Sequence, residues 1–284
     1  MDYRRELIVQ PGSKVKLRNI DPAYHGAHES HDKARDEMEK CLERMGRLQS
    51  LMYAEHKHAL LIVLQGIDAA GKDGVCRHVI DGMNPQGCSV VPFKKPTAED
   101  LDHDFLWRVH RETPPRGHVT VFNRSHYEDV LVVRVHKLAP KETWSARYEL
   151  INDFEKLLST SDTTVIKFFL YISKEEQLER FKTRLEDPAR HWKISDSDYA
   201  EREYWDDYVA AYEDMMEKCS TKHSPWYVIP SNQKWFRNLA VSQIICDTME
   251  DIKMQFPKPA VDIATIRKKY HEAEAQEART EKKK

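Results

Sequence analysis

Short apolar runs alternate with helical patterns along most of the chain. The first run, at residues 59–64, is continuous rather than alternating, which is typical of a strand buried on both faces of a parallel sheet. Similar runs follow at residues 88–93, 118–122, 164–172 and 226–229. Helical spacing of apolar residues occurs around residues 72–83, 98–111, 126–137, 143–160, 174–186, 197–219 and 232–256. This alternation predicts an α/β fold of three layers, with a five-stranded parallel sheet between two layers of helices.

The same pattern divides the chain into three parts. Residues 1–56 are expected to form an irregular lead-in, to about residue 28, followed by an amphipathic helix. Residues 57–256 carry all five strands and form the main domain. Within it, residues 174–225 are longer than a crossover between parallel strands needs, so an inserted helical lid is expected there. Residues 257–284 are a charged tail, expected to be an exposed helix without a function of its own.

A glycine-rich turn follows the first strand. Gly66 and the pair Gly71-Lys72 have the G-x-x-x-x-G-K spacing, with a buried strand before them and an amphipathic helix after them. Glycines let backbone N–H groups turn toward a phosphate, and the helix start adds partial positive charge. An ordinary strand-to-helix turn is the alternative. The spacing predicts phosphate contacts from Gly66, Ala69, Ala70, Gly71, Lys72, Asp73 and Gly74.

Two positions of this turn are unusual. Asp73 stands where such loops have the Ser or Thr whose hydroxyl holds Mg²⁺. Asp68 lies inside the loop, where a carboxylate would repel phosphates unless it binds a metal or lies beside the phosphoryl acceptor. Asp68 is therefore the candidate metal ligand or acceptor-orienting group.

Ionisable side chains also gather after the third strand. Residues 123–129 read Asn-Arg-Ser-His-Tyr-Glu-Asp, and the carboxyl end of a parallel strand borders the ligand crevice. Arg124 could bridge phosphates, and Glu128 or Asp129 could bind a metal or the acceptor. The alternative is a helix capped by Ser125 with solvated charges.

Composition excludes several classes of protein. The chain has 45 Lys and Arg against 47 Asp and Glu, a net charge of −2, so a strongly cationic nucleic-acid binder is not indicated. No apolar run approaches the ~18 residues of a membrane span, and no secretory signal is expected. The five cysteines form no Cys-x-x-Cys pair, which favours reduced thiols in a cytoplasmic protein.

Taken together, these motifs resemble the polyphosphate kinase 2 family. The resemblance covers about residues 14–255, and its motifs occur in the family's order. It includes the glycine-rich turn, Asn84-Pro85-Gln86-Gly87, the run at 104–108, the run at 122–130, the stretch 167–184, Trp192-Lys193 and the stretch 221–230. The resemblance implies a P-loop kinase fold with a helical lid. It also implies reversible transfer of a terminal phosphoryl group between inorganic polyphosphate and a nucleotide, AMP or ADP, giving ADP or ATP, with Mg²⁺.

The resemblance further implies roles for individual residues. Lys72 and the loop amides would hold phosphates, Asp68 would lie at Mg²⁺ and the acceptor phosphate, and Arg124 would hold the transferring group. Basic lid positions of the family match Arg180 and Arg184, and Lys193, beside Trp192, is a further candidate for binding phosphate. Many members have Asp at the position of Asn123, so Asp68, helped by Glu128, would be the main metal ligand. Asn123, Glu128 and Asp129 would lie at the acceptor nucleotide. The run at 126–129 resembles members that use both AMP and ADP, and a homo-oligomer is expected.

Two other functions stay open at this point. The chain could be an ATP-dependent nucleotide or nucleoside kinase, although the missing Ser or Thr after Lys72 argues against it. It could also be a non-catalytic module that binds nucleotide or polyphosphate, although intact Asp68, Lys72 and Arg124 argue against that. A polyphosphate donor would need a basic track, for which the candidates are Arg77, Lys94, Lys95, Arg108 and Arg111.

Overall fold

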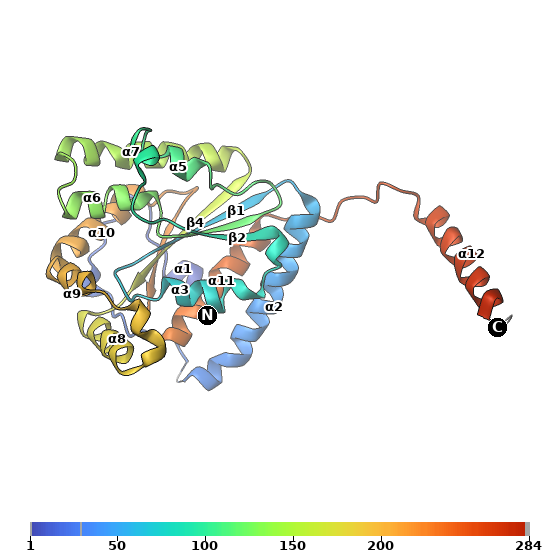
Figure 1. The fold of residues 1–284 in the computed structure, drawn as a ribbon, viewed down its shortest axis with the longest axis horizontal. Helices are drawn as coiled ribbons and strands as arrows, with labels where there is room; N and C mark the ends of the chain where they lie inside the picture. Colours follow the sequence, from blue (N-terminus) through green and yellow to red (C-terminus); the bar gives the residue numbers. More distant parts are fainter. Residues whose placement is uncertain (1, 29, 282–284) are drawn as a thin grey trace. The chain divides into compact units, whose positions relative to one another are not determined.

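A computed structural model describes residues 2–28 and 30–281, apart from the side chains of residues 33 and 281. The chain forms two units, Met1–Met254 and Gln255–Lys284. The first contains the sheet and most of the helices (Figure 1). Among the described residues of the second, the regular element is the helix α12 (Ile263–Glu281), in which the side chains of residues 263–280 are exposed.

The predicted sheet is confirmed. Its strands pair in parallel in the order β2-β3-β1-β4-β5, so β1, which leads into the glycine-rich turn, lies at the centre. Leu64 is in register with Asn123 on β3 and with Phe168 on β4. The strands are β1 (Ala59–Gln65), β2 (Cys88–Pro92), β3 (Val119–Asn123), β4 (Thr163–Tyr171) and β5 (Trp226–Pro230).

Alternate residues of each central strand enter two separate cores. Leu60 and Ile62 pack with α2 (His31–Glu55) and α11 (Lys234–Asp251) on one face. Leu61 and Val63 pack with α7 (Lys141–Thr160) and α10 (Trp205–Cys219) on the other. Figure 1 shows α7 and α2 on opposite sides of the sheet. The continuous apolar run follows from this arrangement, because both faces of β1 are covered.

Several predicted helices are shorter than their patterns suggest. The 98–111 pattern divides into α4 (Ala98–Leu101) and α5 (Trp107–His110), because the Asp104 carboxylate accepts a hydrogen bond from the Leu106 amide and starts a new turn. The 72–83 pattern gives α3 (Lys72–His78) and a 3₁₀ turn, η2 (Ile80–Gly82). The 126–137 pattern gives a 3₁₀ turn, η4 (His126–Asp129), and α6 (Val132–Val135).

The lead-in contains local structure that the pattern does not reveal. It includes α1 (Tyr3–Glu6) and a 3₁₀ turn, η1 (Leu17–Asn19). Tyr3 is fully buried and packs edge-on against Phe236, with ring centroids 5.3 Å apart. Its buried aromatic contact ties the start of the chain to α11. A further 3₁₀ turn, η3 (Pro85–Gly87), precedes β2.

The long connection between β4 and β5 holds the predicted helical insertion. It consists of α8 (Lys174–Glu186), a 3₁₀ turn, η5 (Pro188–Lys193), α9 (Asp196–Glu203) and α10. The 197–219 pattern is divided between α9 and α10 at Tyr204. Both α8 and α10 contribute buried residues, whereas η5 and α9 have none. We call this portion without buried residues, 188–203, the lid segment.

Candidate active site

The glycine-rich turn forms a tight loop between β1 and α3, referred to below as the phosphate loop. Gly66 and Gly71 have φ values of +158° and +108°, and Ala69 has +64°. A Cβ on Gly66 would lie 2.8 Å from the Leu170 carbonyl oxygen, so β4 leaves no room for a side chain there. Residues 66, 69 and 71 therefore give the loop its curvature, and α3 begins directly after it.

Lys72 folds back over this loop. Its side chain is buried, and Nζ donates a hydrogen bond to the Gly66 carbonyl at 2.6 Å. Burial, with a contribution from the nearby charge of Arg124, lowers the pKa of Lys72 to about 8. A bound phosphate would supply a negatively charged partner for the Lys72 ammonium.

Arg124 joins two carboxylates from neighbouring strand ends. It follows β3 in a left-handed conformation, with φ of +63°. Its Nη2 lies 2.5 Å from Oδ1 of Asp68, and its Nη1 lies 3.4 Å from Oε2 of Glu128. Burial alone would lower the pKa of Arg124, but the carboxylates of Glu128 and Asp68 raise it above its ordinary value. The structure thus brings together three residues that the sequence places 56 and 4 positions apart.

The carboxylates beside Arg124 fit a divalent cation. Oε1 of Glu128 is buried and has no hydrogen-bond partner, and Asp68 is about one-quarter exposed. Among the described residues there is no group of three or more His, Cys, Asp or Glu side chains placed to hold a metal. Mg²⁺ in phosphoryl-transfer sites is commonly bound by one or two carboxylates together with substrate phosphates, so two carboxylates are enough.

Asp73 connects three parts of the site. It accepts a hydrogen bond from Nδ2 of Asn123 at 2.9 Å, and Nζ of Lys193 lies 3.3 Å away. Burial alone would raise the pKa of Asp73, but these two contacts hold it below its ordinary value. Its ionised carboxylate therefore links α3 to the end of β3 and to the lid segment.

Asp129 lies apart from the other predicted residues. Its carboxylate accepts a hydrogen bond from Arg147 at 2.9 Å, and burial raises its pKa to about 6. Asp129 is not among the residues that line the cavity formed over Asp68, Lys72 and Arg124. Contact of Asp129 with the acceptor stays a prediction.

The two predicted lid arginines have different surroundings. The Arg180 guanidinium donates to the carbonyls of Ala69 and Ala70 and pairs with Glu176 at 2.7 Å, so it supports the phosphate loop from behind. Nη1 of Arg184 donates to the Lys193 carbonyl at 3.1 Å. Arg184 and Lys193 line both cavities that flank the loop.

These flanking cavities share a wall. The smaller one, about 320 Å³, lies over Asp68, Lys72 and Arg124, and we call it the central cavity. The larger one, about 730 Å³, lies between the phosphate loop, α8, η5 and α11, and we call it the cationic cavity. Its lining has seven arginines and lysines against two aspartates. The residues that line both cavities are Ala69, Gly71, Asp73, Gly74, Arg184 and Lys193.

Candidates for the basic track lie on both sides. Arg77 lines the cationic cavity. A third cavity of about 470 Å³ adjoins the central cavity through Pro92, Phe93 and Lys94, and the remaining candidates, Lys95, Arg108 and Arg111, line it.

Two residues of the site are not evident from the sequence. Arg237, on α11, is 3% exposed and lies against the phosphate loop, 165 positions after Lys72 and outside the motifs that predict the site. Tyr212, on α10, is buried, and burial together with the charge of Glu128 raises its pKa above its ordinary value. The aromatic spacing of residues 204–212 indicates packing, which fits the burial of Tyr212 but gives no sign of its proximity to Glu128.

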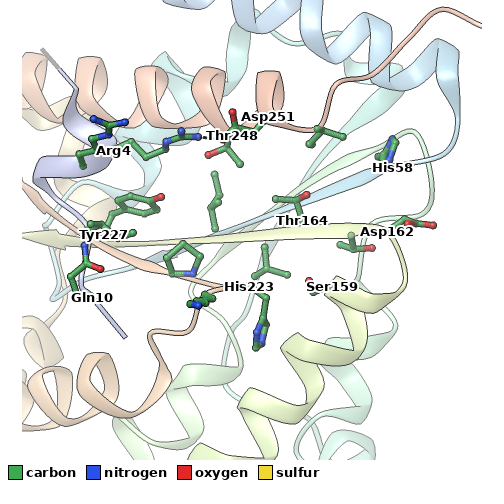
Figure 2. Close-up of a pocket in the computed structure, with 18 residues that line it drawn as sticks. Arg4, Gln10, His58, Ser159, Asp162, Thr164, His223, Tyr227, Thr248 and Asp251 are labelled. Atoms are coloured by element: carbon green, nitrogen blue, oxygen red, sulfur yellow. Dashed lines mark hydrogen bonds and ion pairs between the residues drawn. The ribbon is translucent and has the colours of Figure 1, made fainter. Parts of the chain in front are cut away.

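A cavity of about 790 Å³ lies away from this site. It is formed by the amino-terminal half of β4, the start of β5, the end of α11 and the N-terminal segment. Figure 2 shows Arg4, His223 and Asp251 around it. No residue of the phosphate loop lines it.

Comparisons with known proteins identify the family of the chain. The family model described as polyphosphate kinase 2 matches residues 28–257. The chain is 47% identical to the AMP/ADP-polyphosphate phosphotransferase of Meiothermus ruber, over 88% of this chain and 94% of that protein. It is 44% identical to the ADP-polyphosphate phosphotransferase of Rhodopseudomonas palustris, over 89% and 92%.

A solved structure is similar over nearly the whole chain. The crystal structure of polyphosphate kinase 2 from Arthrobacter aurescens TC1 has a TM-score of 0.92 and 41% sequence identity, and the match covers 96% of this chain and 97% of that one. Family model, relatives and structure all agree: the chain belongs to the polyphosphate kinase 2 family.

Proposed function

We propose that this protein transfers the terminal phosphoryl group of inorganic polyphosphate to AMP and to ADP, reversibly and with Mg²⁺. Members of the family are phosphotransferases, and the relatives' names include polyphosphate with AMP, ADP or both. The observation that carries the proposal is that Lys72 and Arg124 line the central cavity, which shares the phosphate loop, Arg184 and Lys193 with the cationic cavity.

The charge of the cationic cavity supports a polyanionic donor. Seven basic side chains in about 730 Å³ suit a chain of phosphates that carries a negative charge on each unit. An ATP donor would also place an adenine ring in a cavity, and the cationic cavity offers one exposed aromatic side chain, Trp192. We therefore assign the polyphosphate to the cationic cavity and the acceptor nucleotide to the opposite side, next to Phe93.

The transfer needs little acid–base chemistry. An ionised oxygen of the acceptor's terminal phosphate attacks the terminal phosphorus of the polyphosphate and forms a new P–O bond. The anhydride P–O bond breaks, and the shortened chain leaves with its electron pair. Lys72 and the loop amides hold the phosphates, Arg124 stabilises charge on the transferring group, and Asp68 orients Arg124.

Asp68 and Glu128 are the residues that would hold Mg²⁺. The unpartnered Oε1 of Glu128 supports this assignment. When bound, the ion neutralises charge on the phosphates and lowers their mutual repulsion. Asn123 stands where many members have Asp. Its amide donates a hydrogen bond to Asp73, so Asn123 would position the Asp73 carboxylate and would not itself be a charged metal ligand.

The acceptor is proposed to include both AMP and ADP. The relatives at 47% and 44% identity are named for AMP/ADP and for ADP, so similarity alone leaves the acceptor open. The support is the His-Tyr-Glu-Asp run at residues 126–129, in which Glu128 lies 3.4 Å from Arg124.

Three further proposals concern the whole protein. The lid segment would close over both substrates, a homo-oligomer would form, and the protein would act in the cytoplasm. Among the described residues no helix has the length and apolar character that crossing a bilayer requires, and all five cysteines are free thiols. Light scattering coupled to size exclusion would test the homo-oligomer.

The first test is ATP formation without any ATP in the assay. Purified protein is given long-chain polyphosphate and Mg²⁺, with AMP and then with ADP, and ATP is measured by luciferase. We expect ATP from both acceptors. Because contaminating adenylate kinase can convert ADP to ATP, the Lys72→Ala variant, purified in the same way, must lose the signal.

The outcome also separates the alternatives. Activity that requires ATP as the donor would indicate an ordinary P-loop kinase and overturn the proposal. Binding of polyphosphate without turnover from any donor would indicate a non-catalytic module. ATP from ADP but not from AMP would restrict the acceptor and leave the donor assignment intact.

A further inference from the structure

Arg237 fills space beside the phosphate loop that two glycines leave open. A Cβ on Gly71 would lie 1.9 Å from Nη1 of Arg237, and a Cβ on Gly74 would lie 2.7 Å from its Nη2. Any side chain at either position would have to displace the guanidinium. Arg237 is thus packed against the loop itself, although it comes from α11, the helix that follows β5.

The charge of Arg237 is not balanced within the described part of the chain. Its Nε and Nη2 donate to Oδ1 of the adjacent Asn238, at 3.1 and 2.8 Å. Among the described residues, none of the ion pairs includes Arg237, and Nη1 has no acceptor. Burial and the neighbouring Arg180 lower the pKa of Arg237 to about 10.

Arg180 is the informative contrast. It is buried beside Arg237, but its guanidinium is paired with Glu176 and bonded to backbone carbonyls. A buried charge is costly unless a partner compensates it. Arg180 has its partners inside the protein, whereas Arg237 lacks an anionic partner and lines the cationic cavity.

Position decides which anion would pair with Arg237. The guanidinium lies in the cationic cavity against Gly71 and Gly74. Because these two glycines also line the central cavity, only the phosphate loop separates Arg237 from the proposed transfer point beside Lys72 and Arg124. Arginine binds phosphate oxygens through paired N–H donors. Free orthophosphate would fill only one such position, whereas a chain could occupy this position and the transfer point at once.

We propose that Arg237 binds a phosphate of the polyphosphate donor that is not itself transferred. Arg237 then favours donors long enough to reach from the transfer point into the cationic cavity, and it takes no part in binding the nucleotide. This inference rests on the proposed function, since it assumes a polyphosphate donor.

The test compares Arg237→Gln and Arg237→Lys with the unmodified protein. We expect Arg237→Gln to raise KM for long-chain polyphosphate about tenfold or more, the effect of losing one charged hydrogen-bonding partner. KM for ADP should stay within about twofold, and Arg237→Lys should fall between the two proteins because it keeps the charge but loses the paired donors.

Donor length supplies a second readout. The ratio of kcat/KM for long-chain polyphosphate to that for tripolyphosphate should fall in Arg237→Gln. Arg116→Ala is the control, because Arg116 is exposed, pairs with Asp162 and lines neither of the cavities that flank the phosphate loop. Its KM for polyphosphate should change by less than about threefold. Melting temperatures establish that each variant is folded.

Direct binding separates this inference from the proposed function. Calorimetric titration with long-chain polyphosphate, without nucleotide, should show weaker binding to Arg237→Gln than to the unmodified protein. Equal affinities, or an equal rise in KM for polyphosphate and ADP, would overturn the role of Arg237 while leaving the function in place. An unmodified protein that neither binds polyphosphate nor uses it would overturn both. Should Arg237→Gln fail to fold, the same comparisons decide the matter with Arg237→Lys.

Discussion

At the scale of single residues, the site depends on charges held against one another. Arg124 lies between Asp68 and Glu128, and Lys72 folds over the loop and has no ion pair with a carboxylate among the described residues. Bound phosphates would add negative charge that can form ion pairs with Lys72 and Arg124. Changes of charge without change of shape should therefore affect catalysis more than folding.

Replacing Asp68 with Asn tests this directly. The amide keeps the size and the acceptor oxygen that faces Arg124, but it removes the charge that orients the guanidinium and would bind Mg²⁺. We expect kcat to fall by about 100-fold or more, the usual effect of losing one electrostatic group of a transition state. Steady-state kinetics over a range of Mg²⁺ concentrations measures it. An unchanged kcat would exclude Asp68 from the mechanism.

The lowered pKa of Lys72 predicts a pH limit. The free enzyme holds this lysine charged below about pH 8 and neutral above it. Because the charged form binds phosphate, kcat/KM for polyphosphate should decline above about pH 8, approaching tenfold for each further pH unit. The free energy of unfolding should instead rise as the pH increases from about 8 toward 10.5, because deprotonation of Lys72 removes the cost of a buried charge. A profile that is flat to pH 10 would contradict the assignment.

At the scale of elements, the phosphate loop is shaped by two neighbours, β4 and α11. The G-x-x-x-x-G-K spacing predicts the loop because its glycines and lysine are close in sequence. Arg180 has the right helical position but points its guanidinium at loop carbonyls, which spacing along α8 cannot reveal. Arg237 is brought to the loop only by the packing of α11, so no local pattern announces it.

Gly71→Ala should measure how tightly α11 closes on the loop. The new Cβ meets both an unfavourable φ of +108° and the Arg237 guanidinium. Gly12→Ala is the control, since Gly12 has φ of +73° with nothing within 4 Å. The loss in free energy of unfolding should be larger for Gly71→Ala by about 1–3 kcal/mol, the cost of overpacking. Urea denaturation checks this, and equal losses would argue against close packing.

The lid segment carries a natural reporter. Trp192 is 77% exposed, and its ring lies 4.9 Å from Nζ of Lys193, which contacts Asp73. Closure over polyphosphate should shift its fluorescence emission to shorter wavelength as the ring loses water. Trp192→Phe should abolish the shift and keep most of the activity. A shift that persists in this variant would come from another tryptophan and would argue against closure at residues 188–203.

At the scale of the whole molecule, one buried polar cluster joins the elements behind the sheet. Nζ of Lys167, on β4, lies 2.5 Å from Glu155 of α7 and 2.9 Å from the hydroxyl of Tyr127 in η4, and it donates to the Cys219 carbonyl of α10. Lys167 interrupts an apolar strand pattern in the sequence, yet the pattern predicts the strand correctly. The partners of Lys167 come from three separate segments, α7, η4 and α10, and could not be inferred from the sequence.

Lys167→Met should be strongly destabilising. It leaves the Glu155 carboxylate buried without its main partner, which costs about 3–5 kcal/mol. Although burial opposes it, Lys167 and His126 together lower the pKa of Glu155 to about 2. That stabilisation is present above pH ~4.5 and is lost as the pH falls toward 2.

Chemical denaturation at pH 7 and at pH 3.5 checks both statements. The difference between Lys167→Met and the unmodified protein should shrink at the lower pH, because Glu155 in the variant becomes neutral there. In the double variant Lys167→Met/Glu155→Gln, part of the stability should return, since no uncompensated charge remains. A loss unaffected by pH or by the second substitution would mean that packing, rather than charge, holds the cluster.

The central position of the phosphate loop between two openings has a consequence for the order of events. In the proposed function, the donor enters through the cationic cavity and the acceptor from the opposite side, so they would meet at the phosphate loop, whose residues line both cavities. Neither must depart to admit the other, so the reaction should proceed through a ternary complex and not through a phosphorylated enzyme. A long donor can also stay threaded through the cationic cavity while spent nucleotides are exchanged, advancing by one phosphate at each turnover. The protein would then consume polyphosphate processively, from one end.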